Sequence, residues 1–272
     1  MRRFLAGGVL AMTLATAGCA VSTQQEVEMG TQYAAQINQQ LPIVTDPEVN
    51  RYINVLGDSI ARVADSRNLE WHFFVVNSPE VNAFAVPGGY VYINRGLIER
   101  AQNMSQVAGV LGHEIGHVTQ RHSVQQMQKQ QGTNLGLTVG CVLMPSVCNN
   151  QAGAAAIQLG AGAVFANFSR KDESEADQVG IVYVTRAGID PRGIPQMFQI
   201  LLDERERRPG GVDAWFATHP MEEDRIAATT TQIQRTVQPA VLASLSRDSR
   251  NFQAFKQRVQ SLPAAPQAVK GQ

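Results

Sequence analysis

The sequence lacks a surplus of charge, and its first apolar run is too short to cross a membrane. Its 272 residues include 23 basic and 23 acidic side chains. A chain without a basic surplus has no electrostatic reason to bind the phosphates of a nucleic acid, so we expect no nucleic-acid partner. The apolar run from Leu5 to Ala17 has 13 residues, whereas a helix that spans a bilayer needs about 20. We therefore expect this run to be removed and not to span a membrane.

The first residues are typical of an export signal. Two arginines precede the apolar run, and small residues end it directly before Cys19. This order predicts a secretion signal, and its small-small-Cys ending resembles a bacterial lipobox, in which the cysteine receives a lipid. We expect removal of residues 1–18, a lipid on Cys19 and a tether over residues 19–29. Because Ala20 follows the cysteine in place of Asp, we expect the periplasmic side of the outer membrane. An ordinary signal peptide is the alternative.

Cysteine is scarce, and the two others lie in a segment without charged side chains, residues 130–169. In an oxidising compartment such a pair can close, so we expect a Cys141–Cys148 disulfide, with two buried thiols as the alternative. The segment could contain two membrane spans, but Pro145 and a polar Asn-Asn-Gln run leave only short, weakly apolar pieces. We expect a helical hairpin or a lid packed over the functional site.

Hydrophobic periodicity predicts an α+β fold. Apolar residues recur at helical spacing in several segments, and a β-rich stretch with a Pro-Gly-Gly turn lies between them. We expect a mostly helical domain over residues 30–262 with a small three-stranded sheet, followed by a flexible tail over 263–272. The expected helices are 24–40, 46–64, 104–128, 171–186, 191–207 and one that begins near residue 221; the expected strands are 71–76, 82–86 and 90–93.

The segment His113-Glu114-Ile115-Gly116-His117 carries the clearest chemical signal. Two imidazoles four residues apart share one face of a helix and can bind one metal ion. Glu114 lies between them, where its carboxylate can reach a water molecule on that metal and act as a general base. The pattern predicts one zinc ion per chain with His113 and His117 as ligands.

A third ligand is expected from another helix, since a catalytic zinc has three protein ligands and leaves a fourth position for water. Glu173 and Asp177 are four residues apart, on one face of the helix expected over 171–186. One of them can bind the metal while the other accepts the N–H of a ligand histidine and fixes its orientation. A solvated acidic turn is the alternative.

In order and spacing these motifs resemble metallopeptidase family forty-eight, the HtpX-like and CAAX-prenyl-protease-like gluzincins, and most closely its periplasmic lipoprotein branch. The resemblance covers about residues 30–230, and its elements are Asn82-Ala83-Phe84-Ala85-Val86-Pro87-Gly88-Gly89, Asn94-Arg95-Gly96-Leu97, the HExxH segment and Glu173-x-x-Ala-Asp177. It implies a zincin-like metallopeptidase domain with zinc on His113, His117 and Glu173, Glu114 as the base and Asp177 as the partner of a ligand histidine. Membrane members of the family have transmembrane helices, and some periplasmic members have a long C-terminal helical-repeat domain; we expect neither here.

The resemblance extends to Thr218-His219-Pro220 and Arg225. It implies that His219 approaches the zinc, either as a fourth ligand that blocks the water position or as a helper near the reacting carbonyl, and that Arg225 stabilises the developing oxyanion. A histidine that caps the next helix is the structural alternative. His72 and His122 lack comparable context, so we expect an ordinary strand residue and an ordinary surface residue.

An extended substrate can pair backbone to backbone with the strand that contains Asn82, Ala83, Phe84 and Ala85. Such pairing reads shape more than sequence, so the expected substrates are unfolded or misassembled envelope proteins. A rival hypothesis is a chaperone-like outer-membrane assembly factor that uses the same groove without proteolysis. Glu114 argues against it, because a structural zinc needs no general base. A third hypothesis is a latent protease, in which His219 or residues 130–169 cover the zinc.

Overall fold

The computed structural model describes residues 21–131, 168–208, 212–220 and 224–264. Our expectations for Cys19, for the Cys141–Cys148 pair and for the hairpin or lid fall outside the described residues. The elements in chain order are α1 (Thr23–Gln40), α2 (Pro47–Ala64), β1 (His72–Val76), β2 (Ala83–Val86), β3 (Tyr90–Asn94), α3 (Arg95–Arg100), α4 (Met104–Thr119), α5 (His122–Gln131), α9 (Arg170–Arg186), α10 (Gly193–Arg207), α11 (Asp213–Thr218), α12 (Asp224–Thr236), α13 (Pro239–Ser244) and α14 (Arg250–Gln260).

The three strands form one mixed sheet in the order β1-β3-β2. β1 runs parallel to β3, and β2 runs antiparallel to β3 with Ala83 opposite Ile93. The turn between β2 and β3 contains Gly88 and Gly89 at φ values of 83° and 100°, which glycine adopts without steric cost. The expected α+β fold with a small three-stranded sheet is confirmed, and β2 lies at an edge of that sheet.

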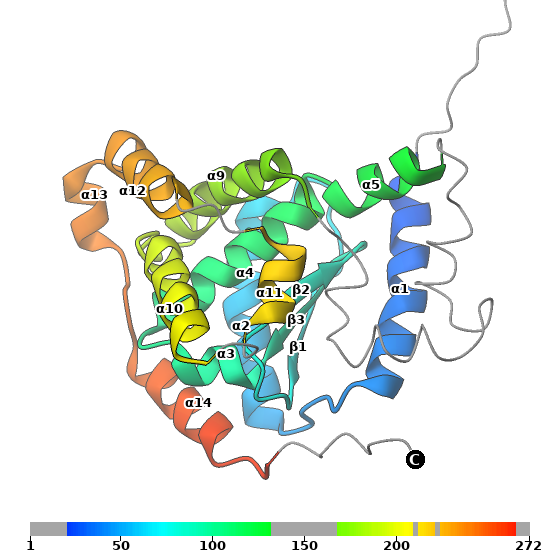
Figure 1. Ribbon diagram of the computed structural model, residues 1–272, viewed down its shortest axis with the longest axis horizontal. Coiled ribbons are helices and arrows are strands. Elements are labelled where there is room, and N and C mark those ends of the chain that lie inside the picture. Colours follow the sequence, from blue (N-terminus) through cyan, green and yellow to red (C-terminus); the bar gives the residue numbers. More distant parts are fainter. Residues whose placement is uncertain (1–20, 132–167, 209–211, 221–223, 265–272) are drawn as a thin grey trace, which may run out of the picture.

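The two faces of the sheet pack against different helices. Ala83 and Ala85 of β2 belong to the main core, which also contains the apolar sides of α2 and α4. Phe84 and Val86, which alternate with them, pack with Tyr33 and the rest of a second cluster on the α1 side. Figure 1 shows α1 beside the sheet and α4 crossing the middle of the molecule.

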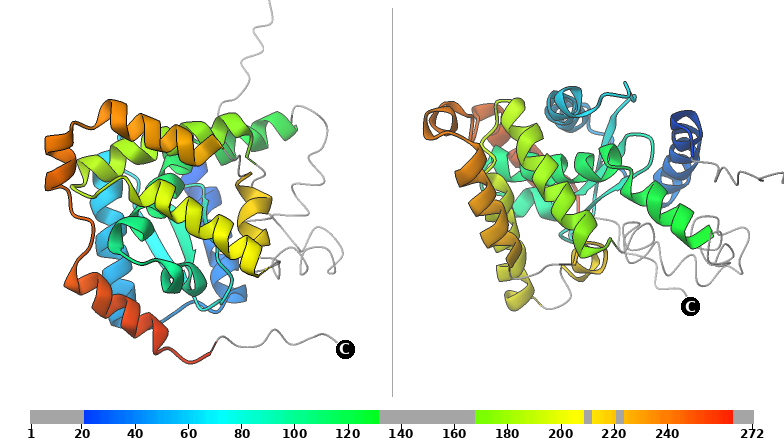
Figure 2. Two further views of the ribbon diagram at one scale, coloured as in Figure 1. Left: turned by 60° about the vertical axis from the view of Figure 1, so that its left-hand side comes forward. Right: turned by 90° about the horizontal axis from the view of Figure 1, so that it is seen from above.

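Helix α4 is the central element of the fold. All of its residues from Met104 to Val118 are buried, because α2, α9, α10 and β2 all pack against it. Helix α12 packs in turn on α9 and α10, and the three helices lie side by side in Figure 2. A helix buried on all sides holds any polar side chain in the interior of the protein. The HExxH segment lies on this helix.

Glycines allow α4 and α9 to approach closely. A Cβ atom on Gly112 would lie 2.7 Å from Cγ1 of Val184, and one on Gly180 would lie 3.2 Å from the main-chain carbonyl carbon of Gly112. A Cβ atom on Gly116, inside the HExxH segment, would lie 3.0 Å from the carbonyl oxygen of Ala176. The missing side chains therefore bring the acidic face of α9 onto the imidazoles of α4.

Some expected boundaries are corrected by the structure. The helix expected over 104–128 is interrupted, because Arg121 has a φ of 59° and turns the chain between α4 and α5. The helix expected from 191 begins at Gly193, since Asp190 instead accepts the N–H of Arg192 in a preceding turn. Helix α1 begins at Thr23, one residue before the helix expected over 24–40. Among the described residues, no helix combines the length and apolarity that a membrane span requires.

Candidate metal centre

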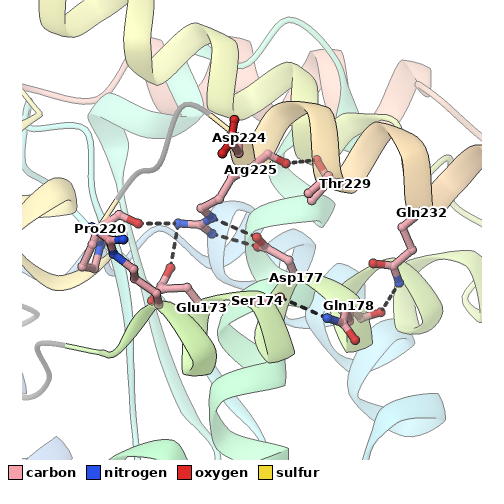
Figure 3. Close-up of a pocket in the computed structure, with 11 residues that line it drawn as sticks. Glu173, Ser174, Asp177, Gln178, Pro220, Asp224, Arg225, Thr229 and Gln232 are labelled. Carbon is pink, nitrogen blue, oxygen red and sulfur yellow. Dashed lines mark hydrogen bonds and ion pairs between the residues drawn. The ribbon is translucent and has the colours of Figure 1, made fainter.

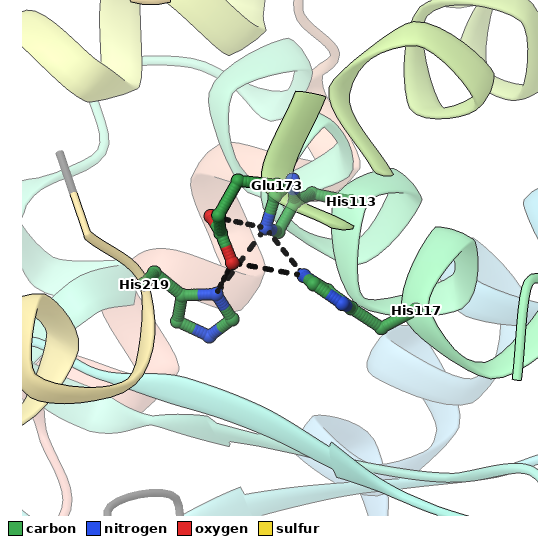
Figure 4. A group of neighbouring side chains, drawn as sticks. All are labelled: His113, His117, Glu173 and His219. Carbon is green, nitrogen blue, oxygen red and sulfur yellow. Dashed lines mark hydrogen bonds and ion pairs between the residues drawn. The ribbon is translucent and has the colours of Figure 1, made fainter. Parts of the chain in front are cut away.

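Four buried side chains from three parts of the chain converge on one point (Figure 4). The Nε2 atoms of His113 and His117, both on α4, are 3.0 Å apart. Carboxylate oxygens of Glu173, in the first turn of α9, lie 3.5 Å from Nε2 of His113 and 3.4 Å from Nε2 of His117. Nδ1 of His219, directly after α11, lies 3.0 Å from Oε1 of Glu173 and 3.4 Å from Nε2 of His113. The four expected residues are thus together, with His219 among them.

The donor atoms fit a tetrahedral zinc ion. Zinc–nitrogen and zinc–oxygen bonds of about 2.0–2.1 Å place neighbouring ligand atoms roughly 3.4 Å apart, and the separations above lie close to that value. Nδ1 of His113 lies 2.8 Å from Oδ1 of Asp177, so it carries the hydrogen and Nε2 carries a lone pair. That lone pair points at Nε2 of His117 and at a carboxylate. A cation between them satisfies all of these acceptors.

The buried carboxylates also indicate that the centre binds a cation. Glu114, Glu173 and Asp177 are between 1% and 4% exposed, and Arg225 is the buried guanidinium that contacts two of them. With the carboxylates ionised and the histidines neutral, two negative charges remain uncompensated. Buried charges are stable only when they are paired or bound to metal. A divalent ion matches this deficit.

In the metal-free centre, a proton on His113 can compensate part of this negative charge. Burial lowers the pKa of His113, but hydrogen bonds to Asp177 and Glu173 outweigh burial and raise the pKa to about 9. Burial holds the pKa of His117 well below its usual value. Burial alone would raise the pKa of Glu173, but the charge of His219 and hydrogen bonds from the three histidines hold that pKa well below its usual range. The centre therefore favours an ionised Glu173 and attracts positive charge.

Arg225 occupies a different place from the expected one. Its Nε and Nη2 atoms donate to Asp177 at 2.9 and 2.8 Å, and Nη1 lies 2.7 Å from Oε2 of Glu173 (Figure 3). The guanidinium is fully engaged with these two carboxylates and packs over the ring of Phe198. This corrects the expectation that Arg225 faces a substrate oxyanion: Arg225 fixes the two carboxylates instead.

A pocket of about 220 Å³ opens beside this ion-pair network. Its lining includes Glu173, Asp177 and Arg225, together with Gln178 and Gln232 (Figure 3). None of the converging histidines lines it, and neither does Glu114. The pocket therefore borders the back of the centre and is not the place where a substrate would meet the general base.

Glu114 lies against both the centre and the edge strand. Its Oε1 atom is 3.4 Å from Nε2 of His219 and has no hydrogen-bond partner among the described residues. Its carboxyl also accepts the backbone N–H of Ala85. Burial raises the pKa of Glu114, although the charges of His219 and His113 oppose the rise. A carboxylate with a raised pKa and a free oxygen is well suited to accept a proton.

The edge strand presents its backbone beside this carboxylate. The N–H of Asn94 donates to the carbonyl of Asn82 at 2.9 Å, so the antiparallel alternation turns the backbone groups of Ala83 and Ala85 away from β3. The Asn82 side chain is fully buried, and neither of its polar atoms has a hydrogen-bond partner among the described residues. The Phe84 ring stacks on Tyr92. Of the expected substrate-binding residues, Ala85 directly contacts Glu114, the expected base.

The structure adds two residues that sequence reasoning missed. Phe168 stacks on the ring of His117, with ring centroids 3.8 Å apart, and Trp215 lies 4.5 Å from the ring of His219. His122, which we expected to be an ordinary surface residue, is only 2% exposed, and its Nδ1 atom lies 3.0 Å from Nδ1 of His117. His72 is an ordinary strand residue that stacks on Tyr90.

Comparison with known proteins agrees with this geometry. The model of Peptidase family M48 matches residues 47–233, which is more than half of the chain. The chain belongs to this family. The matched residues contain the HExxH segment, Glu173, Asp177, His219 and Arg225.

Two kinds of family member are similar to the chain. The beta-barrel assembly-enhancing protease of Escherichia coli is 35% identical over 236 residues, covering 84% of this chain and 48% of that protein. The Yersinia pestis protein of the same name is 36% identical over 219 residues, covering 78% and 44%. The mitochondrial metalloendopeptidase OMA1 of Arabidopsis thaliana is 34% identical over 175 residues, covering 62% and 33%. The chain thus spans less than half the length of these relatives.

Proposed function

We propose that this M48 chain is a zinc-dependent endopeptidase of the bacterial cell envelope that cleaves unfolded or misassembled envelope proteins. The observation that carries the proposal is the convergence of His113, His117, Glu173 and His219 at ligand-to-ligand distances suited to zinc. Glu114, with a free buried oxygen beside them, has the position of a general base. The names of the relatives, which are proteases and metalloendopeptidases, support the same activity.

Each side chain then has a definite role. His113, His117 and Glu173 would hold a zinc ion, which would supply a Lewis acid for a peptide carbonyl and would lower the pKa of water. Glu114 accepts the proton from the attacking water and passes it to the leaving amine, so no covalent intermediate is needed. Asp177 holds the Nδ1–H of His113, and Arg225 holds Asp177.

Substrate recognition is proposed for the outer edge of β2, with which no other strand among the described residues pairs. Backbone groups of Ala83 and Ala85 face away from β3. The N–H of Ala85 is held by Glu114, so an extended peptide would pair with the backbone of Ala83 and with the carbonyl of Ala85 as an added strand. The buried Asn82 side chain at the start of the strand has two unused polar groups that a peptide backbone could satisfy. Backbone pairing is nearly independent of sequence, which suits clients recognised by being unfolded.

The proposed test of activity is Glu114→Gln. The amide cannot accept a proton but keeps the size of the side chain and leaves all four candidate ligands in place. We expect cleavage of an unfolded casein to fall by at least about 100-fold, with zinc content and thermal stability close to wild type. Cleavage that survives the substitution would exclude Glu114 as the base.

We propose that His219 holds the enzyme in a latent form. Its Nδ1 atom lies among the candidate ligand atoms, where a fourth protein ligand would occupy the position that a catalytic zinc leaves to water. His219→Ala should therefore raise the basal rate of casein cleavage while the chain still binds zinc. A basal rate that is unchanged or lower would instead favour a role of His219 near the reacting carbonyl.

The location of the protein is part of the proposal. We propose that a lipid on Cys19 anchors it to the outer membrane, facing the periplasm, and that Cys141 and Cys148 are bonded there. Mass spectrometry of the mature protein tests both features, through the mass of the N-terminal peptide and the reactivity of the two thiols. An N-terminus that starts at another residue without a lipid would remove the anchor.

A non-proteolytic role in assembly remains the rival, because the bacterial relatives are named for enhancing β-barrel assembly. The two roles separate in a strain that carries only the Glu114→Gln protein. Restoration of normal outer-membrane protein levels by this variant would favour binding without cleavage. Failure to restore them, with normal amounts of the variant present, favours proteolysis.

A further inference from the structure

The two candidate histidine ligands on α4 are oriented by different partners. His113 donates directly to a carboxylate, Asp177. His117 instead faces a second imidazole: its Nδ1 atom lies 3.0 Å from Nδ1 of His122. The Nε2 atom of His122 lies 3.3 Å from Oε2 of Glu175, one helical turn from the start of α9. Hydrogen bonds thus link three side chains in series, from the half-exposed carboxylate of Glu175 through His122 to His117 at the metal centre.

Glu175, at the outer end of this series, determines the direction of its hydrogen bonds. The Glu175 carboxylate only accepts, so Nε2 of His122 must carry the hydrogen. In the neutral ring Nδ1 is then an acceptor and takes the Nδ1–H of His117. The Nε2 atom of His117 is left with its lone pair, and this atom faces His113 and Glu173. This arrangement is compatible with His117 as a metal ligand. If His122 instead donated to Nδ1 of His117, the hydrogen of the neutral His117 ring would lie on Nε2, the atom that should bind the metal.

The position of His122 is fixed by the corner between α4 and α5. Arg121 takes a left-handed conformation at φ 59°. His122 therefore starts α5 with its imidazole in contact with His117 of α4. The Arg121 guanidinium donates to Glu26 at 2.7 Å and to the carbonyl of Val21 at 2.6 Å. Glu26 is fully buried and also binds Arg67. A left-handed non-glycine residue is costly, and these bonds hold it in place.

We propose that His122 is a positioning residue for the metal centre, which holds the tautomer and ring orientation of His117 through the chain Glu175–His122–His117. The proposal rests on the proposed metal site and deepens it. It separates His122 from the other unassigned histidine, His72, whose ring lies on β1 and stacks on Tyr90 away from the centre. Partners of ligand histidines typically change metal affinity by 10–100-fold when removed.

Zinc affinity of the metal-free protein, measured by competition with a chromophoric chelator, is the main readout. His122→Phe keeps a ring of similar size but removes the acceptor, and we expect zinc to bind about 10–100-fold more weakly. His122→Asn places its Oδ1 atom where Nδ1 of the imidazole lies, so it should restore affinity to within a few fold of wild type. Glu175→Gln still accepts from His122 and should have a smaller effect than His122→Phe. His72→Phe is the matched control and should leave zinc affinity unchanged.

The outcomes distinguish the possible failures. Wild-type protein that binds no zinc would remove the proposed metal site and with it the proposed function. Wild-type binding with unchanged affinity in His122→Phe would overturn the positioning role alone. Equal loss in His122→Phe and His122→Asn, with melting temperatures lowered alike in the metal-free proteins, would assign His122 to packing and also overturn the proposal. Weaker zinc binding in His122→Phe together with restored zinc binding in His122→Asn supports the proposal.

Discussion

At the scale of single residues, the centre depends on one guanidinium that holds two carboxylates. Arg225 binds Asp177 through two nitrogens and Glu173 through the third, and it is 7% exposed. The planar fork of arginine matches this arrangement, whereas the ammonium of lysine is a point charge on a flexible stem. Removal of one partner from a buried ion pair leaves an uncompensated charge, which is more costly than the pair itself is favourable.

We predict that Arg225→Met lowers the free energy of unfolding of the metal-free protein by about 3–5 kcal/mol, and that Arg225→Lys lowers it by less. Urea unfolding measures both. Arg235→Met is the matched control, since Arg235 lies on the same helix, α12, and is exposed; its unfolding midpoint should hardly move. Similar decreases in the free energy of unfolding in Arg225→Met and Arg235→Met would show that the contacts of Arg225 with Asp177 and Glu173 contribute little to stability.

Sequence reasoning selected the side chains that spacing places on one face of a helix. The HExxH pattern predicts a shared helical face, and Glu173 with Asp177 predicts a second one; the structure brings these residues together. His122 could not be predicted, because nothing in the spacing signals that Arg121 turns the chain there. The oxyanion role expected for Arg225 failed for a similar reason: contacts across helices set its partners.

At the scale of elements, the site depends on the separation of α4 and α9. Helix periodicity predicted both helices, with α9 starting one residue earlier than expected at Arg170. The short helices α3, α11 and α13 have too few turns to show a period and were not predicted. The shared metal ligands predicted that α9 packs against α4. The glycine contacts that make this crossing close were not predicted, because a glycine in a helix signals flexibility as readily as close packing.

We predict that Gly112→Ala destabilises the protein by about 1–3 kcal/mol, although alanine is the better helix former. Its Cβ atom would lie 2.7 Å from Cγ1 of Val184. Val184→Ala alone removes buried methyl groups and should also cost about 1–3 kcal/mol. In the double variant the overlap with Val184 is gone and only the 3.3 Å approach to the carbonyl oxygen of Gly180 remains, so the loss should be smaller than the sum of the two single losses. Strictly additive losses in chemical denaturation would mean that the helices do not touch at this point.

At the scale of the whole molecule, the centre links segments that are distant in the sequence. The ligand candidates come from α4, from α9 and from the residue after α11, and the His113–His219 pair is separated by 106 residues. The residues that lead to His219 reach the core mainly through Val212 and Trp215. A bound metal would therefore tie α11 to the centre in addition to this packing.

Removal of zinc should accordingly loosen one part of the chain first. Zinc that binds only the folded protein stabilises it by about 4 kcal/mol at a free concentration 1,000 times the dissociation constant. A chelator should therefore lower the melting temperature, and hydrogen exchange should increase more in α11 than in α2, which carries none of the candidate ligands. Glu114→Gln keeps all the candidate ligands and should respond to the chelator like wild type, whereas His113→Ala should show the loosened α11 even with zinc present. The protein must be shown to hold zinc before the chelator is added. Equal hydrogen exchange in α11 with and without the chelator would then mean that His219 does not bind the metal, because removal of the metal from a ligand must free the segment that carries that ligand.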